Sequence, residues 1–268
     1  MAKSLIALVS DFGTRDHYVG AMKGVIYSIN PEATVVDVSH DLPPHDIAAA
    51  ADELACTYKY FPPGTVFLVV IDPGVGSARR GIAAEAGEWR FVAPDNGVLS
   101  GVFAEHPPKK VVELTERRYA RPTVSRTFEG RDRFAPAAAW LSKGVHLPAF
   151  GRPITDPMVL DRAMPTMGET SVSGVVTRID RFGNVITNLD RRSCGRLTEG
   201  TGVLQLEVAG HGIHRIVSTY TEIAPGEVAA LFGSTDHLEC AMRAERAADR
   251  LGVAPGDRVV LSRVSSPA

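Results

Sequence analysis

The sequence predicts an α/β N-terminal domain with a largely parallel sheet, followed by a smaller C-terminal all-β barrel domain. Over about the first 150 residues, short apolar runs alternate with amphipathic stretches, which is typical of a parallel sheet covered by helices. Beyond residue 173, short β-like runs are separated by glycine-containing turns, which is typical of a small barrel or sandwich. The stretch 152–173 has three prolines and no clear period, so we interpret it as a linker and expect domains at 1–160 and 161–268.

Two helices are predicted between the first three strands of the N-terminal domain. Residues 16–30 carry apolar side chains at helical spacing and end just before Pro31, and residues 46–60 repeat that pattern. The strand runs are continuously apolar, as in VFLVVI, which fits strands that are buried on both faces. In chain order the expected elements are Leu5–Val9, Asp16–Asn30, Thr34–Val38, Asp46–Tyr60 and Thr65–Ile71.

Six strands are predicted in the C-terminal domain from runs rich in β-branched and other apolar residues. Turns that contain glycine separate most of these runs, and no internal repeat is found. The expected strands are Gly174–Ile179, Asn184–Leu189, Val203–Val208, Ile213–Ser218, Glu227–Phe232 and Arg258–Leu261.

Composition excludes several classes of partner. The chain has 268 residues, 44% hydrophobic and 22% charged, and a net charge of −2 gives no electrostatic reason to expect nucleic acid or an anionic membrane. No apolar run approaches the ~20 residues of a membrane-spanning helix, and the start MAKSLIALVSDFG is interpreted as a strand and not a signal peptide. Three cysteines without a CxxC pair indicate reduced thiols, so we expect a cytoplasmic protein that handles a small molecule.

Acidic and polar residues follow the ends of all three N-terminal strands. Asp11 follows LIALVS, Ser39–Asp41 follow TVVDV, and Asp72 follows VFLVVI. Ligands bind beyond the carboxyl ends of the strands in open α/β sheets, so this edge is the expected binding edge. For Asp11 an alternative is a capping role for the helix that begins near Asp16.

The stretch VDVSHDLPPHD at 36–46 allows two interpretations. Its histidines and carboxylates are ligand types that bind divalent metals, so His40 and His45 suggest a metal site. The two prolines followed by Asp46 are also an ordinary helix start.

The turn IDPGVGSARR at 71–80 lacks the terminal Gly-Lys-Ser/Thr of a Walker loop. Gly74 and Gly76 allow backbone N–H groups to approach a ligand closely. Asp72 and Arg79 are seven residues apart, so a folded-back turn can pair them. A plain salt bridge that supports the turn is an equally common outcome.

The stretch IDRFGNVITN at 179–188 is typical of a hairpin or bulge turn, for which Gly-Asn is well suited. A second interpretation is a shallow site for a purine ring. Phe182 would supply an aromatic face, with the amide of Asn184 and the carboxylate of Asp180 beside it.

Together these stretches resemble the S-adenosylmethionine hydroxide adenosyltransferases, relatives of the fluorinase and chlorinase. The resemblance implies an α/β domain followed by a β-barrel, assembled as a homotrimer whose active sites lie between the first domain of one subunit and the second domain of its neighbour. It implies attack of water or hydroxide at ribose C5′ of S-adenosylmethionine, which releases adenosine and L-methionine without metal or cofactor. The matching stretches, in order, are SDFGTRDHYVGAMKG, VVDVSHDLPPHDI, FPPGTVFLVVIDPGVGSARR, VAPDNGVLS, TFEGRDRFAPAAA, IDRFGNVITN and LFGSTDHLECAM.

The resemblance also implies roles for single residues. Asp11 is expected to hold the ribose hydroxyls and Asn184 the adenine edge. Asp180 and Ser234 are expected to hold the amino and carboxylate groups of methionine. Further pocket residues are Glu239 and the backbone near Met242.

Among the residues expected to lie near the attacking water, one departs from the family pattern. The Asp72–Arg79 pair matches hydrolytic members and is not kept by the halogenating relatives, which favours water over halide. The family phrase Phe-His-Gly-Arg-Asp becomes Phe-Glu-Gly-Arg-Asp here, with Glu129 in place of the histidine. A carboxylate can orient a water as an imidazole can, so we expect Glu129 to pair with Arg79 or Arg131 and to orient the water.

Four alternatives to these expectations stay open. The first is that Glu129 belongs to a purely structural Glu–Arg pair. The second is a protein that binds S-adenosylmethionine or adenosine without turnover. A metal-dependent hydrolase built on His40 and His45, and a halogenase, are the other two.

Overall fold

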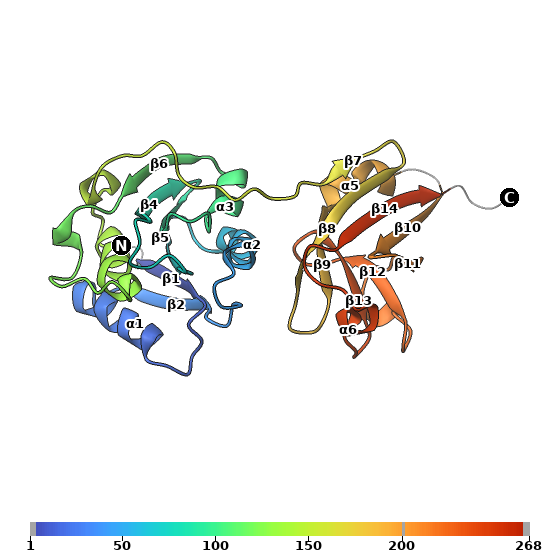
Figure 1. Ribbon diagram of the computed structural model, residues 1–268, viewed down its shortest axis with the longest axis horizontal. Helices are drawn as coiled ribbons and strands as arrows, with labels where there is room; N and C mark the ends of the chain where they lie inside the picture. Colours follow the sequence, from blue (N-terminus) through green and yellow to red (C-terminus); the bar gives the residue numbers. More distant parts are fainter. Residues whose placement is uncertain (1–3, 200–201, 265–268) are drawn as a thin grey trace. The chain divides into compact units, whose positions relative to one another are not determined.

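A six-stranded sheet with helices on both faces forms the first unit of the chain, Met1–Leu160 (Figure 1). The computed structural model describes residues 4–199 and 202–264. The strands of this sheet are β1 (Leu5–Ser10), β2 (Thr34–Ser39), β3 (Val66–Val70), β4 (Gly81–Ala86), β5 (Trp89–Pro94) and β6 (Pro108–Glu113). Its helices are α1 (Tyr18–Ile29), α2 (Ile47–Thr57), α3 (Ser100–Glu105) and α4 (Ala135–Ser142).

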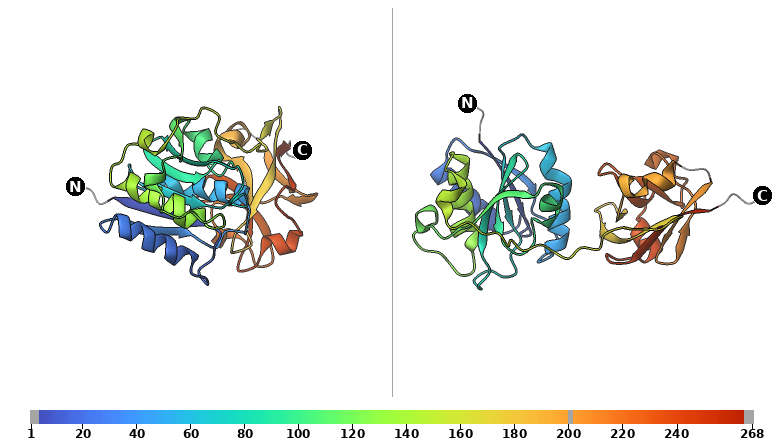
Figure 2. Two further views of the ribbon diagram at one scale, coloured as in Figure 1. Left: turned by 60° about the vertical axis from the view of Figure 1, so that its left-hand side comes forward. Right: turned by 90° about the horizontal axis from the view of Figure 1, so that it is seen from above.

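Alternating side chains of the central strands feed two separate cores. In β1, Ile6 and Leu8 pack into the cluster that contains α1 and α4, whereas Ala7 and Val9 pack into the cluster that contains α2 and α3. This follows from the two-residue period of a strand, and it explains why the strand runs are apolar throughout. The views from above and from the side show the resulting helix–sheet–helix layers of this unit (Figure 2).

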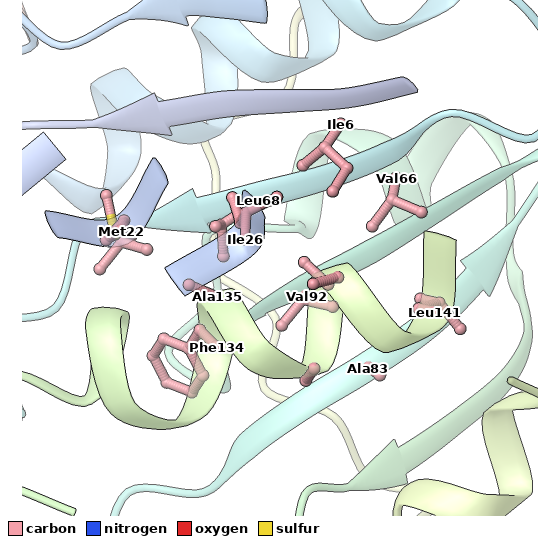
Figure 3. Packing of buried hydrophobic residues seen from close by; sticks show 14 of the residues in the cluster. Ile6, Met22, Ile26, Val66, Leu68, Ala83, Val92, Phe134, Ala135 and Leu141 are labelled. Atoms are coloured by element: carbon pink, nitrogen blue, oxygen red, sulfur yellow. The ribbon is translucent and has the colours of Figure 1, made fainter. Parts of the chain in front are cut away.

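The core between the sheet and the α1–α4 layer is shown in Figure 3. Ile26 of α1 lies beside Leu68 of β3, Met22 of α1 belongs to the same cluster, and Phe134 lies at the start of the α4 segment. These side chains are almost completely buried. Each such burial stabilises the fold by about 1.5–3 kcal/mol, so this layer fixes where the segment before α4 lies.

The sheet is mixed, and its parallel character holds for only part of it. In the order β2-β1-β3-β5-β4-β6, the first four strands are parallel and β4 is antiparallel to both of its neighbours. The prediction of a largely parallel sheet was therefore too broad. The reason is local: β4 and β5 are joined by two residues, Gly87 and Glu88, and a connection that short can join only antiparallel strands.

The predicted elements of this unit are present with small changes at their ends. Asp46 caps α2, since its side chain accepts a hydrogen bond from the backbone N–H of Ala49 at 2.9 Å. The helix predicted from Asp16 begins at Tyr18. Glu129 directly precedes a π-helical turn, Gly130–Phe134, which continues into α4. Such turns are frequent at functional sites.

The second unit, Asp161–Ala268, is a nearly closed antiparallel barrel (Figure 1). Its strands follow the order β11-β10-β14-β8-β9-β13-β12, with β7 paired to β8. Two short helices also belong to it, so it is not purely β. The elements are β7 (Thr166–Met167), β8 (Ser171–Ile179), β9 (Val185–Asp190), α5 (Arg191–Thr198), β10 (Val203–Val208), β11 (His211–Ile213), β12 (Val228–Phe232), β13 (His237–Met242), α6 (Ala247–Leu251) and β14 (Arg258–Val264).

One predicted strand of the barrel is displaced, and two strands were missed. The run expected at Ile213–Ser218 is wrong, because β11 ends at Ile213 and only Ile216 forms an isolated bridge, to Ala230. The missed strands are the two-residue β7, which lies in the stretch interpreted as a linker, and β13. The sequence of β13, HLECAM, mixes charged and apolar residues. Its central position between β9 and β12 places Glu239 inside the fold.

Candidate functional site

The turn after β3 folds back so that Arg79 forms an ion pair with Asp72. The guanidinium donates from Nε to Asp72 Oδ1 at 3.0 Å and from Nη2 to Asp72 Oδ2 at 2.5 Å. Both side chains are less than a tenth exposed, and the Arg79 guanidinium lies 5.2 Å from the ring centroid of Phe134. The expected pairing is confirmed, in the two-pronged form that arginine gives with carboxylates.

Glu129 joins this pair from the segment before α4. Arg79 Nη2 donates to Glu129 Oε2 at 2.7 Å, and Arg133 Nη2 lies 3.7 Å from Glu129 Oε1. The expectation that Glu129 pairs with an arginine is confirmed for Arg79. Arg131 does not take this role, because it forms two hydrogen bonds with Asp132.

In this cluster Asp72 takes up a proton more readily than an exposed aspartate does, because its pKa is raised. Burial is the largest cause that raises the pKa of Asp72, and the nearby Glu129 carboxylate raises it further. Arg79 acts in the opposite direction through charge and hydrogen bonds, without cancelling the rise. A carboxyl group with a raised pKa at a sheet edge is a feature of acid–base sites.

A tight backbone contact holds the turn that carries Asp72. Gly76 has φ +76°, and a Cβ at this position would lie 2.3 Å from the backbone oxygen of Arg126. The two segments that deliver Asp72 and Glu129 therefore touch through a position that only glycine fits.

Gly76→Ala is expected to destabilise the protein by more than about 1 kcal/mol and to lower activity, because the turn must move away from Arg126. Thermal unfolding and a rate assay measure the two effects. Gly226→Ala is the matched control, since Gly226 also has positive φ but no atom within 4 Å of the added Cβ. Equal losses in both variants would show that contact with Arg126 does not matter.

Asp11 lies at the same sheet edge as Asp72. In the parallel pairing of β1 with β3, Ser10 is opposite Val70, so both aspartates follow the carboxyl ends of neighbouring strands. The Asp11 side chain is 7% exposed and accepts a hydrogen bond from the backbone N–H of His45 at 2.8 Å. It does not cap α1, whose first turn has no side-chain cap, so that alternative is wrong.

The histidines at 40 and 45 do not come together. His40 is buried, with Nδ1 2.7 Å from Ser10 Oγ and Nε2 3.0 Å from Asp37 Oδ1, whereas the His45 ring is 76% exposed. Across the described ranges 4–199 and 202–264, no three His, Cys, Asp or Glu side chains are grouped as metal ligands. The metal-site interpretation of this stretch is therefore not supported, and the segment supports the backbone around Asp11.

Aromatic packing ties the loop after β1 to the Glu129 segment. The ring of Phe128 meets Phe12 and Tyr18 edge-on, with centroids 5.8 and 5.2 Å apart. The Arg131 guanidinium lies over the Phe128 ring, 5.1 Å from its centroid. The residues that follow Asp11 and precede Glu129 in sequence, Phe12 and Phe128, are thus packed against each other.

The second unit contains a pocket of about 680 Å³. All six residues that the resemblance and the turn pattern assigned to this domain line it. They are Asp180, Phe182, Asn184, Ser234, Glu239 and Met242. Two separate stretches of sequence, at 180–184 and 234–242, are thereby brought together.

The Asp180 turn is both a tight hairpin and a pocket wall. Asp180 Oδ1 accepts from the backbone N–H groups of Phe182 and Asn184, and Oδ2 accepts from the Asn184 side-chain amide, all at 2.9 Å. Gly183 has φ +86° and packs closely against Arg246. The backbone oxygen of Asn184 accepts from the N–H of Asp180 at 3.1 Å, so its side-chain Oδ1 is the acceptor that this network leaves. The Phe182 ring is 76% exposed, and together the two groups suit a flat heterocycle.

Glu239 is the buried acid of the pocket. Burial raises its pKa, and the Tyr220 hydroxyl donates a short hydrogen bond to Oε1. A Cβ on Gly233 would meet Glu239 Oε2 at 2.2 Å, so glycine is required there for the carboxyl group to fit.

Family models match both units of the chain. Residues 6–151 match the SAM hydroxide adenosyltransferase N-terminal domain, and residues 174–260 match the SAM hydroxide adenosyltransferase C-terminal domain. The chain belongs to the SAM hydroxide adenosyltransferase family. The resemblance that the sequence motifs suggested is confirmed.

Relatives match over nearly the whole chain. A protein from Salinispora tropica named (R)-S-adenosyl-L-methionine hydrolase is 39% identical over 258 residues, or 95% of this chain and 96% of that protein. A protein of the same name from Thermus thermophilus is 37% identical over 259 residues, 94% and 96% of the two chains. A solved structure of an uncharacterized conserved protein from Thermotoga maritima has a TM-score of 0.92 at 34% identity and covers 96% of this chain and 100% of that one.

Two site features of this member of the SAM hydroxide adenosyltransferase family escaped sequence reasoning. Arg133 is four residues after Glu129, a spacing that can place side chains together on a helix and could have been used. Tyr220 offers no such signal, because it meets Glu239 across 19 residues of sequence.

Among the described residues, no helix is long and apolar enough to cross a bilayer.

Proposed function

We propose that this protein hydrolyses S-adenosyl-L-methionine to adenosine and L-methionine. A water oxygen forms a bond to ribose C5′ while the C5′–S bond breaks. The electron pair of that bond stays on sulfur, which becomes the neutral thioether of methionine, and the water proton passes to a carboxylate. No cofactor takes part, and the substrate supplies its own leaving group.

The observation that carries this proposal is the bridge that Arg79 forms between the Asp72 and Glu129 carboxylates. Both oxygens of Asp72 are engaged by Arg79, whereas Glu129 Oε1 accepts no hydrogen bond from the Arg133 guanidinium 3.7 Å away. We assign Glu129 Oε1 as the acceptor that orients the water and receives its proton, and Asp72 with Arg79 as its support. A positioned base contributes roughly 10²–10⁴-fold.

Charge sets where these carboxylates have to act. The sulfonium loses its positive charge as the C5′–S bond breaks, so a carboxylate beside sulfur would stabilise substrate more than transition state. The water side of C5′ is therefore the place for Glu129. Arg79 offsets the negative charge there and limits any attraction to the sulfonium.

The second-unit pocket is proposed to bind the substrate. Phe182 and the side-chain Oδ1 of Asn184 suit adenine. Asp180 and Ser234 suit the amino and carboxylate groups of methionine, and Asp11 suits the ribose hydroxyls. Glu239 and Met242 line the same pocket.

A homotrimer is the proposed assembly, with the first unit of one subunit completing the pocket of its neighbour. The cytoplasm is the proposed compartment, because Cys56, Cys194 and Cys240 are all free thiols, as is usual in a reducing compartment.

Mixing two inactive variants tests the shared site. Asp72→Asn and Asp180→Ala each disable one unit, so subunits mixed by unfolding and refolding together regain part of the activity when the site lies between subunits. Light scattering gives the mass of the assembly. Absence of regained activity in a trimer of normal mass would place each site within one subunit.

Chromatography of adenosine and methionine after incubation with S-adenosylmethionine tests the reaction itself. Wild type is expected to form both products in equal amounts, with and without chloride. Binding of S-adenosylmethionine without product would indicate a protein that binds this molecule without turnover. A 5′-chlorinated adenosine would indicate a halogenase. Product from Glu129→His but none from wild type would identify Glu129 as the residue that abolished turnover.

Asn184→Ala is expected to weaken adenosine binding about 10-fold or more, because the pocket loses an acceptor and Asp180 loses a donor. Isothermal titration calorimetry with adenosine measures the change in Kd. Asn188→Ala is the matched control, since Asn188 in β9 makes its hydrogen bonds with Val175 and Ala163 outside the pocket. An unchanged Kd in Asn184→Ala would remove Asn184 from the adenine site.

A further inference from the structure

The Glu129 site contains a second cation. Asp72, Arg79 and Glu129 alone carry a net charge of −1, and Arg133 Nη2 lies 3.7 Å from Glu129 Oε1. With Arg133 the four side chains are electrically neutral. Arg133 is one-third exposed, whereas the other three side chains are close to nine-tenths buried or more.

We infer that Arg133 is a positioning residue for the proposed hydrolysis, which allows a carboxylate at 129 to serve where the family phrase has a histidine. The inference rests on the proposed function. It assigns to Arg133 the task of balancing the second carboxylate and of aiming Oε1 of Glu129 at the water.

The two arginines hold different oxygens of Glu129. Arg79 occupies Oε2 through a hydrogen bond of 2.7 Å. Arg133 attracts Oε1 from 3.7 Å, which is beyond hydrogen-bond distance. Oε1 is therefore stabilised as an anion and still has its lone pairs available for a water.

A balancing cation is needed because Glu129 stands close to another carboxylate. The two carboxylates are held at the same nitrogen, Arg79 Nη2, so their negative charges oppose each other at short range. In keeping with this, Glu129 is one of the groups that raise the pKa of Asp72. One guanidinium shared by both cannot neutralise them. Without Arg133, one of the two carboxylates would take up a proton more readily, and a protonated Glu129 cannot accept one from water.

The other arginines of this segment are engaged elsewhere. Arg131 is bound to Asp132, and Arg126 donates to the backbone oxygen of Gly76. Arg133 also borders a cavity of about 110 Å³ with Glu116 and Arg117 on its wall, so these two charges face it as well. Between them they add no net charge, and Glu129 is the ion-pair partner within reach.

A double-mutant cycle tests the inference. In the wild-type background, Arg133→Met is expected to lower kcat about 10-fold or more with little change in KM, and Arg133→Lys is expected to restore part of the loss. In the Glu129→His background the same Arg133→Met change is expected not to lower kcat, because a histidine adds no second negative charge beside Asp72. A purely structural Arg133 would lower kcat equally in both backgrounds, and that result would overturn the inference.

Two further measurements complete the test. Arg118→Met is the control, because Arg118 forms an exposed ion pair with Glu116 at the same 3.7 Å, and its kcat is expected to match wild type. Carbon-13 NMR titration of carboxyl groups, assigned with Glu129→Gln, is expected to show that Arg133→Met raises the apparent pKa of the Asp72–Glu129 pair. If wild type forms no adenosine, the proposed function fails, and this titration still decides whether Arg133 balances Glu129.

Discussion

Asp72→Asn is expected to lower kcat for S-adenosylmethionine hydrolysis by roughly 10²–10⁴-fold, with KM changed much less. The amide has nearly the shape of the carboxylate, but it presents an NH₂ group to a guanidinium that now meets two carboxylate oxygens. Arg79 then loses its anchor, and Glu129, which Arg79 holds, loses its orientation. Initial rates over a range of substrate concentrations separate kcat from KM.

The pH dependence adds a second signature of Asp72. Because the pKa of Asp72 is raised, we expect kcat/KM to fall on acidification at a pH above the ~3.9 of an ordinary aspartate. Folding stability changes in the opposite direction. A group with a raised folded-state pKa contributes stability at low pH that is lost as pH rises through that pKa. Asp72→Asn is expected to remove the part of each dependence that Asp72 causes, which leaves Glu129 as the titrating carboxylate of the site.

Asp156→Asn is the control for Asp72. Asp156 also pairs with an arginine, Arg80, at 2.9 Å, but its side chain is 76% exposed. Its kcat and its pH profile are expected to match wild type. A wild-type kcat in Asp72→Asn itself would exclude Asp72 from the reaction.

Arg79→Met is expected to give the largest loss of stability, about 3–5 kcal/mol in the free energy of unfolding, together with loss of activity. The change leaves Asp72 and Glu129 facing each other with their shared donor removed. Removal of one partner from a buried ion pair is costly, because the charge that remains is neither hydrated nor paired. Denaturant unfolding measures the free energy, and circular dichroism confirms that the variant is folded.

Arg152→Met is the comparison for Arg79. Arg152 pairs with Glu113 at 2.8 Å, but its side chain is 72% exposed, and exposed pairs contribute about 0–1 kcal/mol. The two variants remove the same group from ion pairs that differ in burial. Similar losses of stability in both would mean that the Arg79 cluster is well hydrated and that its role in the reaction does not depend on burial.

The order of the first strands and helices could be predicted because it depends on the local pattern of apolar residues. The strands at β1, β2 and β3 and the helices α1 and α2 follow from apolar periodicity, and Asp46 follows from the chemistry of helix caps. Alternation of strands and helices does not give the direction of β4, although the two-residue turn at Gly87 and Glu88 contains it. The strand expected at Ile213–Ser218 failed because a short apolar run does not reveal where it finds a partner.

In the candidate site, too, some features could be predicted from the sequence and others could not. Motifs in the sequence named Asp72, Arg79 and the six pocket residues, and the pairing of Asp72 with Arg79 followed from a seven-residue spacing within one turn. Local patterns did not say that Asp11 accepts from His45 instead of capping α1.

The linear sequence therefore settled the family motifs, the first three strands and the two helices between them, since these depend on neighbours a few positions away. Only the tertiary structure decided which charged and polar side chains contact each other. Glu129 meets Arg79 across 50 residues, and Tyr220 meets Glu239 across 19. Such pairs depend on how the segment before α4 packs through Phe134, and on the place of β13 in the barrel. The physical reason is that ion pairing and burial depend on distance in space, which strand order and core packing fix.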